Sequence, residues 1–253
     1  MSYLLVSRSL TPAPRQQPLH FTSMAAFAPD IYVTPQVRKL LADEAAVLAP
    51  LLARCTGDHG LHLTTSAQAE PPAMPLLGHW ATVRVAGAAL GGDIRASGLE
   101  ALPFADEAFG VVLLRHALET TARQDNLLDE AIRVLAPGGM LAITGIHPFG
   151  LWSPWVARQS RAPRPRLTWP WWWSQRLVRD EFELSMPRRV GSAWPRVGGA
   201  SGPGSLVGGG YFLVARKKRP SAVPLRPRMV AVPAPIPGTL ASGARRNARE
   251  PLS

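Results

Sequence analysis

The sequence predicts an α/β protein with a doubly wound, mostly parallel β-sheet. Three observations in residues 99–147 lead to this fold class. The run FGVVLL, residues 109–114, is apolar and partly β-branched, as expected of a strand buried on both faces. Apolar residues then recur at helical spacing, and the run MLAITGI, residues 140–146, resembles a second buried strand. A strand, a helix and a strand at this spacing indicate a right-handed crossover between parallel neighbours.

The helix of this unit is predicted to begin at Asp125, whose side chain can cap it. Its apolar positions are Leu127, Leu128, Ala131, Ile132 and Leu135. The turn Pro137-Gly138-Gly139 is expected to stop the helix, because proline cannot continue it and glycine tolerates left-handed dihedral angles.

The chain has 253 residues, enough for one sizeable α/β domain with long ends. We expect residues 30–218 to form this domain. Residues 1–29 and 219–253 are expected to be disordered, since they offer no periodic apolar face. The net charge of +11 is uneven, because residues 151–253 carry 18 basic and 4 acidic side chains. The basicity therefore belongs to the last hundred residues.

The location of the protein is predicted from its cysteine content and its apolar runs. The single cysteine, Cys55, excludes an intramolecular disulfide and fits a reducing compartment. No apolar run approaches the ~20 residues needed to cross a bilayer, and the N-terminus does not read as a signal peptide. A cytoplasmic protein is therefore expected.

Residues 35–54 favour a helix that packs on the sheet. The apolar positions of this segment are Val37, Leu40, Leu41, Ala45, Val47, Leu48, Leu51 and Leu52. Thr34 is expected to be the N-cap, with Pro35 at the first helical position. Pro50 is expected to kink or split the helix.

Residues 99–152 resemble class I S-adenosylmethionine (SAM) dependent methyltransferases of type 11. The pattern of that family is LPF with an acidic turn, a strand, an H-x-L-E-like loop and then R-V-L-x-P-G-G. This chain matches it with LPFADEAF at residues 102–109, a strand, RHALE at residues 115–119, a helix and RVLAPGGMLAITG at residues 133–145. The run GIHPFGLW resembles the G-F-N-P-x-S-L-W-G run of a bacterial subgroup. The resemblance implies a Rossmann-like sheet of seven strands, the last one antiparallel, and SAM as the cofactor.

The first strand and glycine-rich loop of the family have the pattern L-D-L-G-x-G-x-G. They align with residues 60–68 of this chain, GLHLTTSAQ. Glycine is needed there because the backbone turns sharply and approaches the cofactor closely. This chain has Thr64, Ser66 and Gln68 at the glycine positions and His62 at the acidic one. The small polar residues Thr64, Thr65 and Ser66 can still hydrogen-bond a carboxylate or an amine. They are candidate cofactor residues, and weak binding of SAM is expected.

Two further acidic positions of the family's cofactor site are lost. The strand expected at residues 81–89 contains no carboxylate for the ribose hydroxyls, and the adenine-facing position is Gly98. Gly98 and Leu99 remain candidate cofactor contacts. Only 33 residues separate Gln68 from Leu102, too few for two strands and two helices, so at least one crossover helix is expected to be missing or reduced.

Two histidines follow the two predicted strands of the recognisable segment. His116 occupies the loop that lines the methionine end of the cofactor in the family, next to Arg115, and His147 follows the second strand. Ligands bind at this edge of open α/β sheets. His116 and His147 are therefore candidate catalytic bases, and Arg115 and His116 are candidate cofactor contacts. A structural role for His116 is the alternative. The histidines and Cys55 lack ligand spacing, so no metal site is expected.

Residues 151–200 are rich in tryptophan and arginine and are expected to form a lid or an insertion. This stretch contains seven of the eight tryptophans, and Trp152 and Trp155 are candidate lid residues over the substrate. Tryptophans can pack on the edge of the sheet while arginines stay solvated. The same composition also suits base stacking with phosphate contacts, or a membrane-surface patch.

The resemblance implies methyl transfer from SAM to an unidentified small-molecule acceptor, with alignment supplied by the protein and His116 or His147 as the base. A second hypothesis is a non-catalytic binding or regulatory protein with a degenerate SAM site, which the lost glycines and acids favour. A third is an RNA-associated protein that uses the basic C-terminal third. The methyl acceptor and the oligomeric state stay open at this point.

Overall fold

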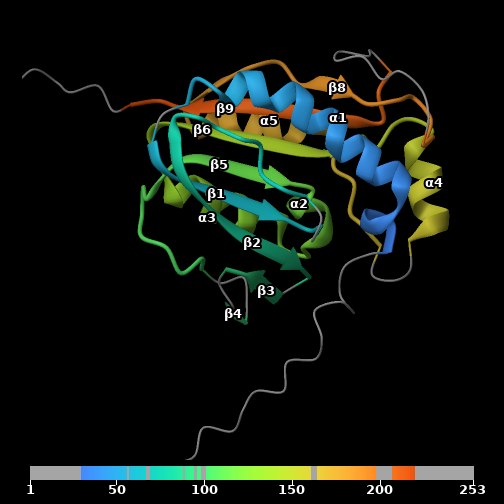
Figure 1. Cartoon of the computed structure of the whole chain (residues 1–253), viewed down its shortest axis with the longest axis horizontal. Helices are drawn as coiled ribbons and strands as arrows, with labels where there is room; N and C mark the ends of the chain where they lie inside the picture. Colours follow the sequence, from blue (N-terminus) through green and yellow to red (C-terminus); the bar gives the residue numbers. More distant parts are fainter. Residues whose placement is uncertain are drawn as a thin grey trace, which may run out of the picture. The chain divides into compact units, whose positions relative to one another are not determined.

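Four parallel strands form the centre of a nine-stranded sheet (Figure 1). In spatial order they are β2 (Leu77–Ala86), β1 (Gly57–Thr64), β5 (Phe109–Arg115) and β6 (Leu135–Ile146). Antiparallel strands extend both sides, namely β3 (Ala89–Gly92) and β4 (Ala96–Ser97) beyond β2, and β9 (Gly210–Lys217), β7 (Phe182–Leu184) and β8 (Arg188–Val190) beyond β6. The predicted parallel centre with a late antiparallel strand is confirmed, but the expected number of seven strands is wrong.

The computed structural model describes residues 30–55, 57–66, 69–87, 89–93, 96–97, 101–160, 164–197 and 207–219. All of these belong to one compact unit, Met1–Pro220. The N-terminal extension and residues 220–253 of the basic tail lie outside the described residues. No helix in the described ranges is long and apolar enough to span a bilayer.

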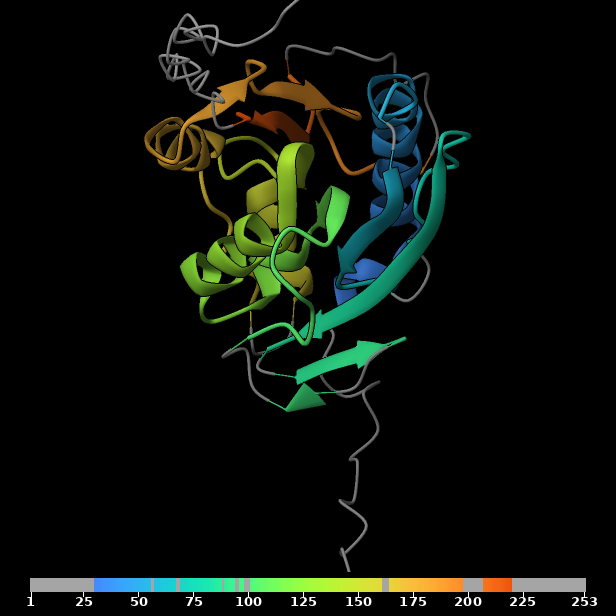
Figure 2. The same ribbon diagram turned by 90° about the vertical axis from the view of Figure 1, so that its left-hand side faces the viewer.

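Helices lie on both faces of the sheet (Figure 2). One face is covered by α1 (Pro35–Leu52), and the 3₁₀ turn η2 (Asp30–Val33) and α4 (Trp152–Gln159) lie beside its N-terminal end (Figure 1). The other face is covered by α2 (Ala117–Thr120), α3 (Gln124–Val134) and α5 (Pro170–Arg179). Side chains of β5 alternate between two cores, since Val111 and Leu113 pack under α1 while Val112 and Leu114 pack on the opposite side. The prediction that this strand is buried on both faces is confirmed.

The first crossover of the sheet, between β1 and β2, has no helix in its described residues. The described residues between β1 and β2 contain turns and extended backbone only, and β2 continues into β3 through Gly87, whose φ is +63°. This confirms the prediction that at least one crossover helix is missing or reduced. On that face α1, from the N-terminal part of the chain, packs on the sheet together with η2 and α4.

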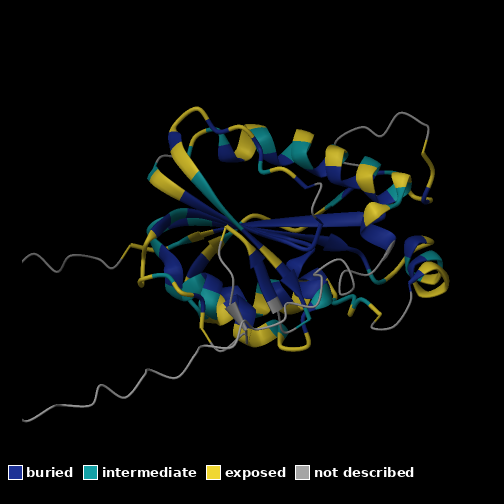
Figure 3. Ribbon diagram, turned by 60° about the horizontal axis from the view of Figure 1, so that its bottom comes forward, coloured by how far each residue is buried: buried dark blue, intermediate teal, exposed yellow. Residues whose placement is uncertain are grey.

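Helix α1 follows its sequence signals at the start. The Val37 amide donates to Thr34 Oγ1 over 3.5 Å, so Thr34 is the N-cap, as predicted. The helix turns its exposed residues away from the sheet (Figure 3). The prediction of a split at Pro50 is wrong, because α1 runs through Pro50 to Leu52. A proline this close to the end removes only its own N–H bond and leaves the last turn intact.

The boundaries of α3 and β6 also differ from expectation. Helix α3 begins at Gln124, so Asp125 lies in its first turn, where a carboxylate still interacts favourably with the helix dipole, and does not cap it. The helix ends at Val134, and Leu135 already pairs with Phe109 as the first residue of β6. The proline-glycine turn therefore lies inside the irregular start of the strand, where the register shifts.

Candidate active site at the carboxyl edge of the sheet

The carboxyl ends of β1, β5 and β6 carry six of the residues predicted to form the site, and all six are buried. They are Thr64, Thr65, Ser66, Arg115, His116 and His147. The other two predicted cofactor contacts, Gly98 and Leu99, lie outside the described residues, as does Gln68. The six residues divide into one group around His116 and a second group around His147.

His116 is the centre of a buried ionic network. Its Nε2 lies 3.0 Å from Glu44 Oε1 of α1, and its Nδ1 lies 3.1 Å from Glu119 Oε2 of α2. The Tyr32 hydroxyl donates to Glu119, and Arg115 Nε lies 3.8 Å from Glu44. The network joins η2 and α1 to the end of β5. Glu44 could not be found from the sequence, because its partners lie on elements that are distant along the chain.

This arrangement sets the charge of His116. Burial alone would lower the pKa of the imidazole, but the carboxylates of Glu44 and Glu119 outweigh it and raise the pKa to about 10. Both ring nitrogens therefore carry protons at neutral pH and donate to carboxylates. An imidazolium held in this way has no lone pair with which to accept a proton. The geometry favours the structural role of His116 that the sequence left open as an alternative.

Stability is expected to be highest near pH 6.5 and to fall on both sides. The contribution of His116 is fully present below about 6.5, the unfolded pKa, and is lost as the pH rises toward 10. Burial, assisted by Arg115, lowers the pKa of His62 to about 3, so stability is also lost as the pH falls below 6.5. One proton corresponds to a slope of about 1.4 kcal/mol per pH unit.

Urea denaturation of the full chain at acidic, near-neutral and alkaline pH measures both slopes. In a His62→Leu variant, the free energy of unfolding is expected to change less steeply with pH below pH 6.5. Its dependence on pH above 6.5 is expected to be the same as in the unmodified chain. A free energy of unfolding that is constant between pH 6.5 and 9 would contradict the charged state assigned to His116.

The remaining residues of the His116 group bond to the protein itself. Arg115 Nη1 donates over 2.8 Å to the Glu70 carbonyl, and Nη2 donates to the Leu41 carbonyl of α1. The Thr65 hydroxyl lies 3.1 Å from the His116 carbonyl, to which it can donate. Arg115 Nε is buried without a hydrogen-bond partner among the described residues.

SAM needs donors for its carboxylate and an acceptor for its ribose hydroxyls. Thr64, Thr65 and Arg115 carry donors of the kind that suit the carboxylate, but these donors already bond within the protein. The Thr64 hydroxyl donates to the Ser66 carbonyl, the Thr65 hydroxyl to the His116 carbonyl, and the two Nη atoms of Arg115 to the Glu70 and Leu41 carbonyls. On the nucleoside side, β2 ends at Ala86 and carries no carboxylate, and none follows at Gly87. The described residues therefore fit the amino-acid end of the cofactor only if these donors exchange their present partners, and they provide no carboxylate at the end of β2 for the ribose.

A cavity of about 490 Å³ lies at the same edge, beyond the end of β6. Its walls come from the start of α5, the segment between β7 and β8, and the start of β9. It is lined by His147, Trp169, Pro170, Trp171, Ser174, Leu184, Ser185, Met186, Pro187, Arg188, Arg189 and Tyr211. The cavity is mostly aromatic and aliphatic with two arginines, which is typical of small-molecule sites with a few polar groups.

The neighbours of His147 fix its tautomer. Arg189 Nη2 lies 2.6 Å from His147 Nδ1, and the Phe149 amide lies 3.1 Å from the same atom. The Phe149 carbonyl also lies 2.9 Å from Nδ1, but two donors face this atom, so we assign the lone pair to Nδ1 and the proton of the neutral ring to Nε2. Burial and the Arg189 charge lower the pKa of His147. His147 is therefore a neutral donor in this conformation, and its lone pair is occupied.

The two predicted lid residues do not line this cavity. Trp152 is 1% exposed, and its Nε1 donates over 2.9 Å to the Ser192 carbonyl. Trp155 is in edge contact with it at 5.6 Å between ring centroids. The walls are formed instead by Trp169 and Trp171, which sequence reasoning did not single out. Their signal was the proline-started run WPWWWSQR, in which the first turn of a helix presents the aromatics.

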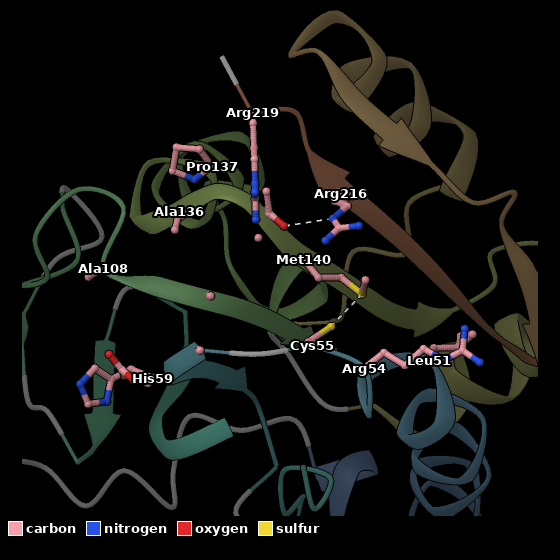
Figure 4. Close-up of a pocket in the computed structure, with 15 residues that line it drawn as sticks. Leu51, Arg54, Cys55, His59, Ala108, Ala136, Pro137, Met140, Arg216 and Arg219 are labelled. Carbon is pink, nitrogen blue, oxygen red and sulfur yellow. Dashed lines mark hydrogen bonds between the residues drawn. The ribbon is translucent and has the colours of Figure 1, made fainter. Parts of the chain in front are cut away.

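A second cavity of about 490 Å³ lies at the opposite, amino edge of the sheet (Figure 4). Cys55 Sγ lies 3.4 Å from Met140 Sδ there, and Arg216 Nε donates to the Gly138 carbonyl over 3.1 Å. None of the predicted site residues lines it. Within the described residues, no group of histidine, cysteine and carboxylate side chains could hold a metal ion.

Comparison with known proteins finds similarity to methyltransferases in the central segment. Residues 78–143 match the family described as Methyltransferase domain. Phthiotriol/phenolphthiotriol dimycocerosates methyltransferase 1 of Mycobacterium ulcerans is 38% identical over 69 residues, which are 27% of this chain. The chain thus spans only 26% of the length of this curated relative.

The fold is shared with a solved structure. The crystal structure of a SAM-dependent methyltransferase from Thermotoga maritima matches with a TM-score of 0.50 and 14% identity, covering 75% of this chain and 94% of that chain. The resemblance to class I methyltransferases and the doubly wound Rossmann-like fold are both confirmed. The family implies SAM as the cofactor, while the methyl acceptor is not identified by these matches.

Proposed function

We propose that this chain, whose residues 78–143 belong to the methyltransferase-domain family, transfers a methyl group from SAM to a small acceptor with an apolar or aromatic body and an ionised group. The observation that carries this proposal is the cavity beyond β6. It lies at the edge where open α/β sheets bind ligands, and its lining combines aromatic rings with Arg188 and Arg189.

The residues that would hold the cofactor are Thr64, Thr65 and Arg115. Their hydroxyls and guanidinium would donate to the carboxylate of the amino-acid end in exchange for their present carbonyl partners. When bound, SAM supplies an electrophilic methyl group on its sulfonium. The aromatic walls of the cavity would exclude water and hold the acceptor body in place, so that orientation provides most of the rate enhancement.

The protonation states of the two histidines define the acceptor. His116 is held as an imidazolium, and the lone pair of His147 is occupied by Arg189. With neither ring free as a base, an acceptor that is already ionised, such as a carboxylate or a phenolate, is the best fit. Arg188 is exposed at the cavity and forms no ion pair with a described residue, so it can attract such an anion.

Calorimetric titration of the purified full chain with SAM and with S-adenosylhomocysteine tests the cofactor. The missing ribose carboxylate is expected to weaken binding about ten- to a hundred-fold relative to an intact relative, since one charged hydrogen bond is absent. Binding as tight as that of an intact relative would contradict the assignment of the degenerate site. No detectable binding of either compound would overturn the proposed activity.

Methyl transfer from labelled SAM to a panel of aromatic and aliphatic acids tests the acceptor. Arg188→Ala is expected to raise KM for an accepted acid about tenfold while leaving the Kd for SAM unchanged. Arg84→Ala is the matched control, because Arg84 is an exposed arginine of β2 and does not line the cavity. Equal effects of both substitutions would contradict a role of Arg188 in acceptor binding.

The His116 network favours a second candidate function, a non-catalytic binding protein with the methyltransferase fold. Glu44 and the Leu41 carbonyl of α1 bond directly to the strand-end residues that would face the cofactor. For this function, the acids of the panel are expected to bind in the cavity, with no binding of SAM. The same titrations therefore separate the two functions.

A further inference from the structure

Four exposed aromatic residues form a continuous surface beside the cavity. We name Phe149, Trp169, Trp171 and Trp172 the aromatic ladder; their exposed fractions are 63%, 46%, 48% and 60%. Successive ring centroids lie 5.8, 5.9 and 5.6 Å apart. Isolated exposed apolar residues are normal, whereas a contiguous apolar patch marks an interaction surface.

The aromatic ladder lies at the rim of the cavity beyond β6, which the proposed function assigns to the acceptor. Trp169 and Trp171 line the cavity as well as facing solvent. Met186, which lines it too, is 83% exposed. The edge of the cavity is thus apolar and open, so a partner that covers the ladder also covers the entrance of the cavity.

The charge around the ladder is positive. Residues 147–160 and 164–197 contain eight arginines and three carboxylates. Arg188 lines the cavity, Arg179 lines a hollow together with Trp172, and neither forms an ion pair with a described residue. Arg176 pairs with Asp129 of α3 and with Asp180, the residue after α5, while Asp125 of α3 also lines the hollow beside Trp172.

We propose that the aromatic ladder docks on the surface of an anionic lipid bilayer, and that the acceptor is an amphiphile which enters the cavity from that surface. Tryptophan side chains prefer the headgroup level of a bilayer, and arginines add attraction to anionic lipids. The docking does not depend on the proposed function. The identity of the acceptor does rest on it.

The geometry of the ladder favours a bilayer over a nucleic acid strand. Base stacking requires aromatic faces that lie open as platforms. Two of the three ladder contacts are edge-on, with interplanar angles of 89° for Phe149–Trp169 and 74° for Trp171–Trp172. Met186 and the half-exposed Leu151 offer apolar surface and no ring. These features suit insertion between headgroups better than stacking on bases.

Co-sedimentation of the full chain with vesicles tests the docking. Binding is expected to mixed phosphatidylcholine–phosphatidylglycerol vesicles, to be negligible with phosphatidylcholine alone, and to weaken as salt is added. The double variant Trp171→Ala/Trp172→Ala is expected to bind the mixed vesicles at least about tenfold more weakly. Because the basic tail is unchanged in this variant, the loss isolates the ladder.

The control is the double variant Leu51→Ala/Leu76→Ala. Both leucines are exposed, by 43% and 55%, and neither lies on the ladder or lines the cavity beyond β6. This variant is expected to bind vesicles like the unmodified chain. Equal losses in the two double variants, no binding to mixed vesicles, or ladder-dependent binding to single-stranded RNA without binding to vesicles would each overturn the docking.

The two proposals fail separately. Vesicle binding needs no SAM, so its loss would leave methyl transfer to soluble acids intact. Conversely, a chain that binds vesicles through the ladder but neither SAM nor S-adenosylhomocysteine would support the docking and overturn the proposed activity. An amphiphilic acid presented in the mixed vesicles is expected to be methylated faster than the same acid in solution. The Trp171→Ala/Trp172→Ala variant should reduce that difference.

Discussion

Replacing Glu44 by alanine is expected to lower the free energy of unfolding by about 3–5 kcal/mol, as for other buried ion pairs that lose one partner. Glu44 is fully buried and contacts His116 at 3.0 Å, with Arg115 at 3.8 Å. Removal of this carboxylate leaves the buried imidazolium of His116 with one carboxylate neighbour, Glu119. It leaves the guanidinium of Arg115 without a carboxylate neighbour among the described residues. Urea denaturation at pH 7, read as the shift of the midpoint at constant slope, measures the loss.

The neighbouring residue Asp43 provides the matched control. It is a carboxylate on the same helix that pairs with Lys39 over 2.6 Å near the surface. An i,i+4 pair of this kind contributes only about 0.3–0.5 kcal/mol, so Asp43→Ala should lower stability little. Equal and small losses for the two variants would contradict the buried ionic network around His116.

Replacing Trp152 by alanine is expected to cost about 3–5 kcal/mol of unfolding free energy, the range for a fully buried aromatic side chain. The ring packs in the core under α1 and is so close to the Gly209 backbone that a Cβ atom there would lie 1.9 Å from it. The substitution also removes one of the two hydrogen bonds to the Ser192 carbonyl, which keeps the bond from the Gly209 amide. Chemical denaturation of the purified variant measures the loss.

Trp172→Ala is the control for this prediction. Trp172 belongs to the same tryptophan-rich region but is 60% exposed, so its substitution is expected to change stability by less than about 0.5 kcal/mol. If Trp152→Ala left stability unchanged and reduced only ligand binding, Trp152 would be the lid residue that the sequence suggested. The contrast separates tryptophans of the core from tryptophans of the surface, which composition alone cannot do.

Local sequence determined the central unit of the fold. The apolar runs of β5 and β6 specify strands buried on both faces, because each residue of such a run must leave water whichever way it points. The Thr34 cap and the pattern of α1 specify a helix from bonds made within the segment. The short distance between Gln68 and Leu102 also predicted that a crossover helix was missing or reduced, since chain length limits what can be built.

Tertiary structure alone decided the chemistry of the candidate site. The sequence placed His116 and His147 at the correct edge, but their protonation depends on Glu44, Glu119 and Arg189, which come from three other elements. A pKa reflects every charge within a few ångströms, and such neighbours are set by packing between segments that are distant along the chain. For the same reason the sequence assigned Trp152 to a lid, although packing against the Gly209 backbone holds it in the core.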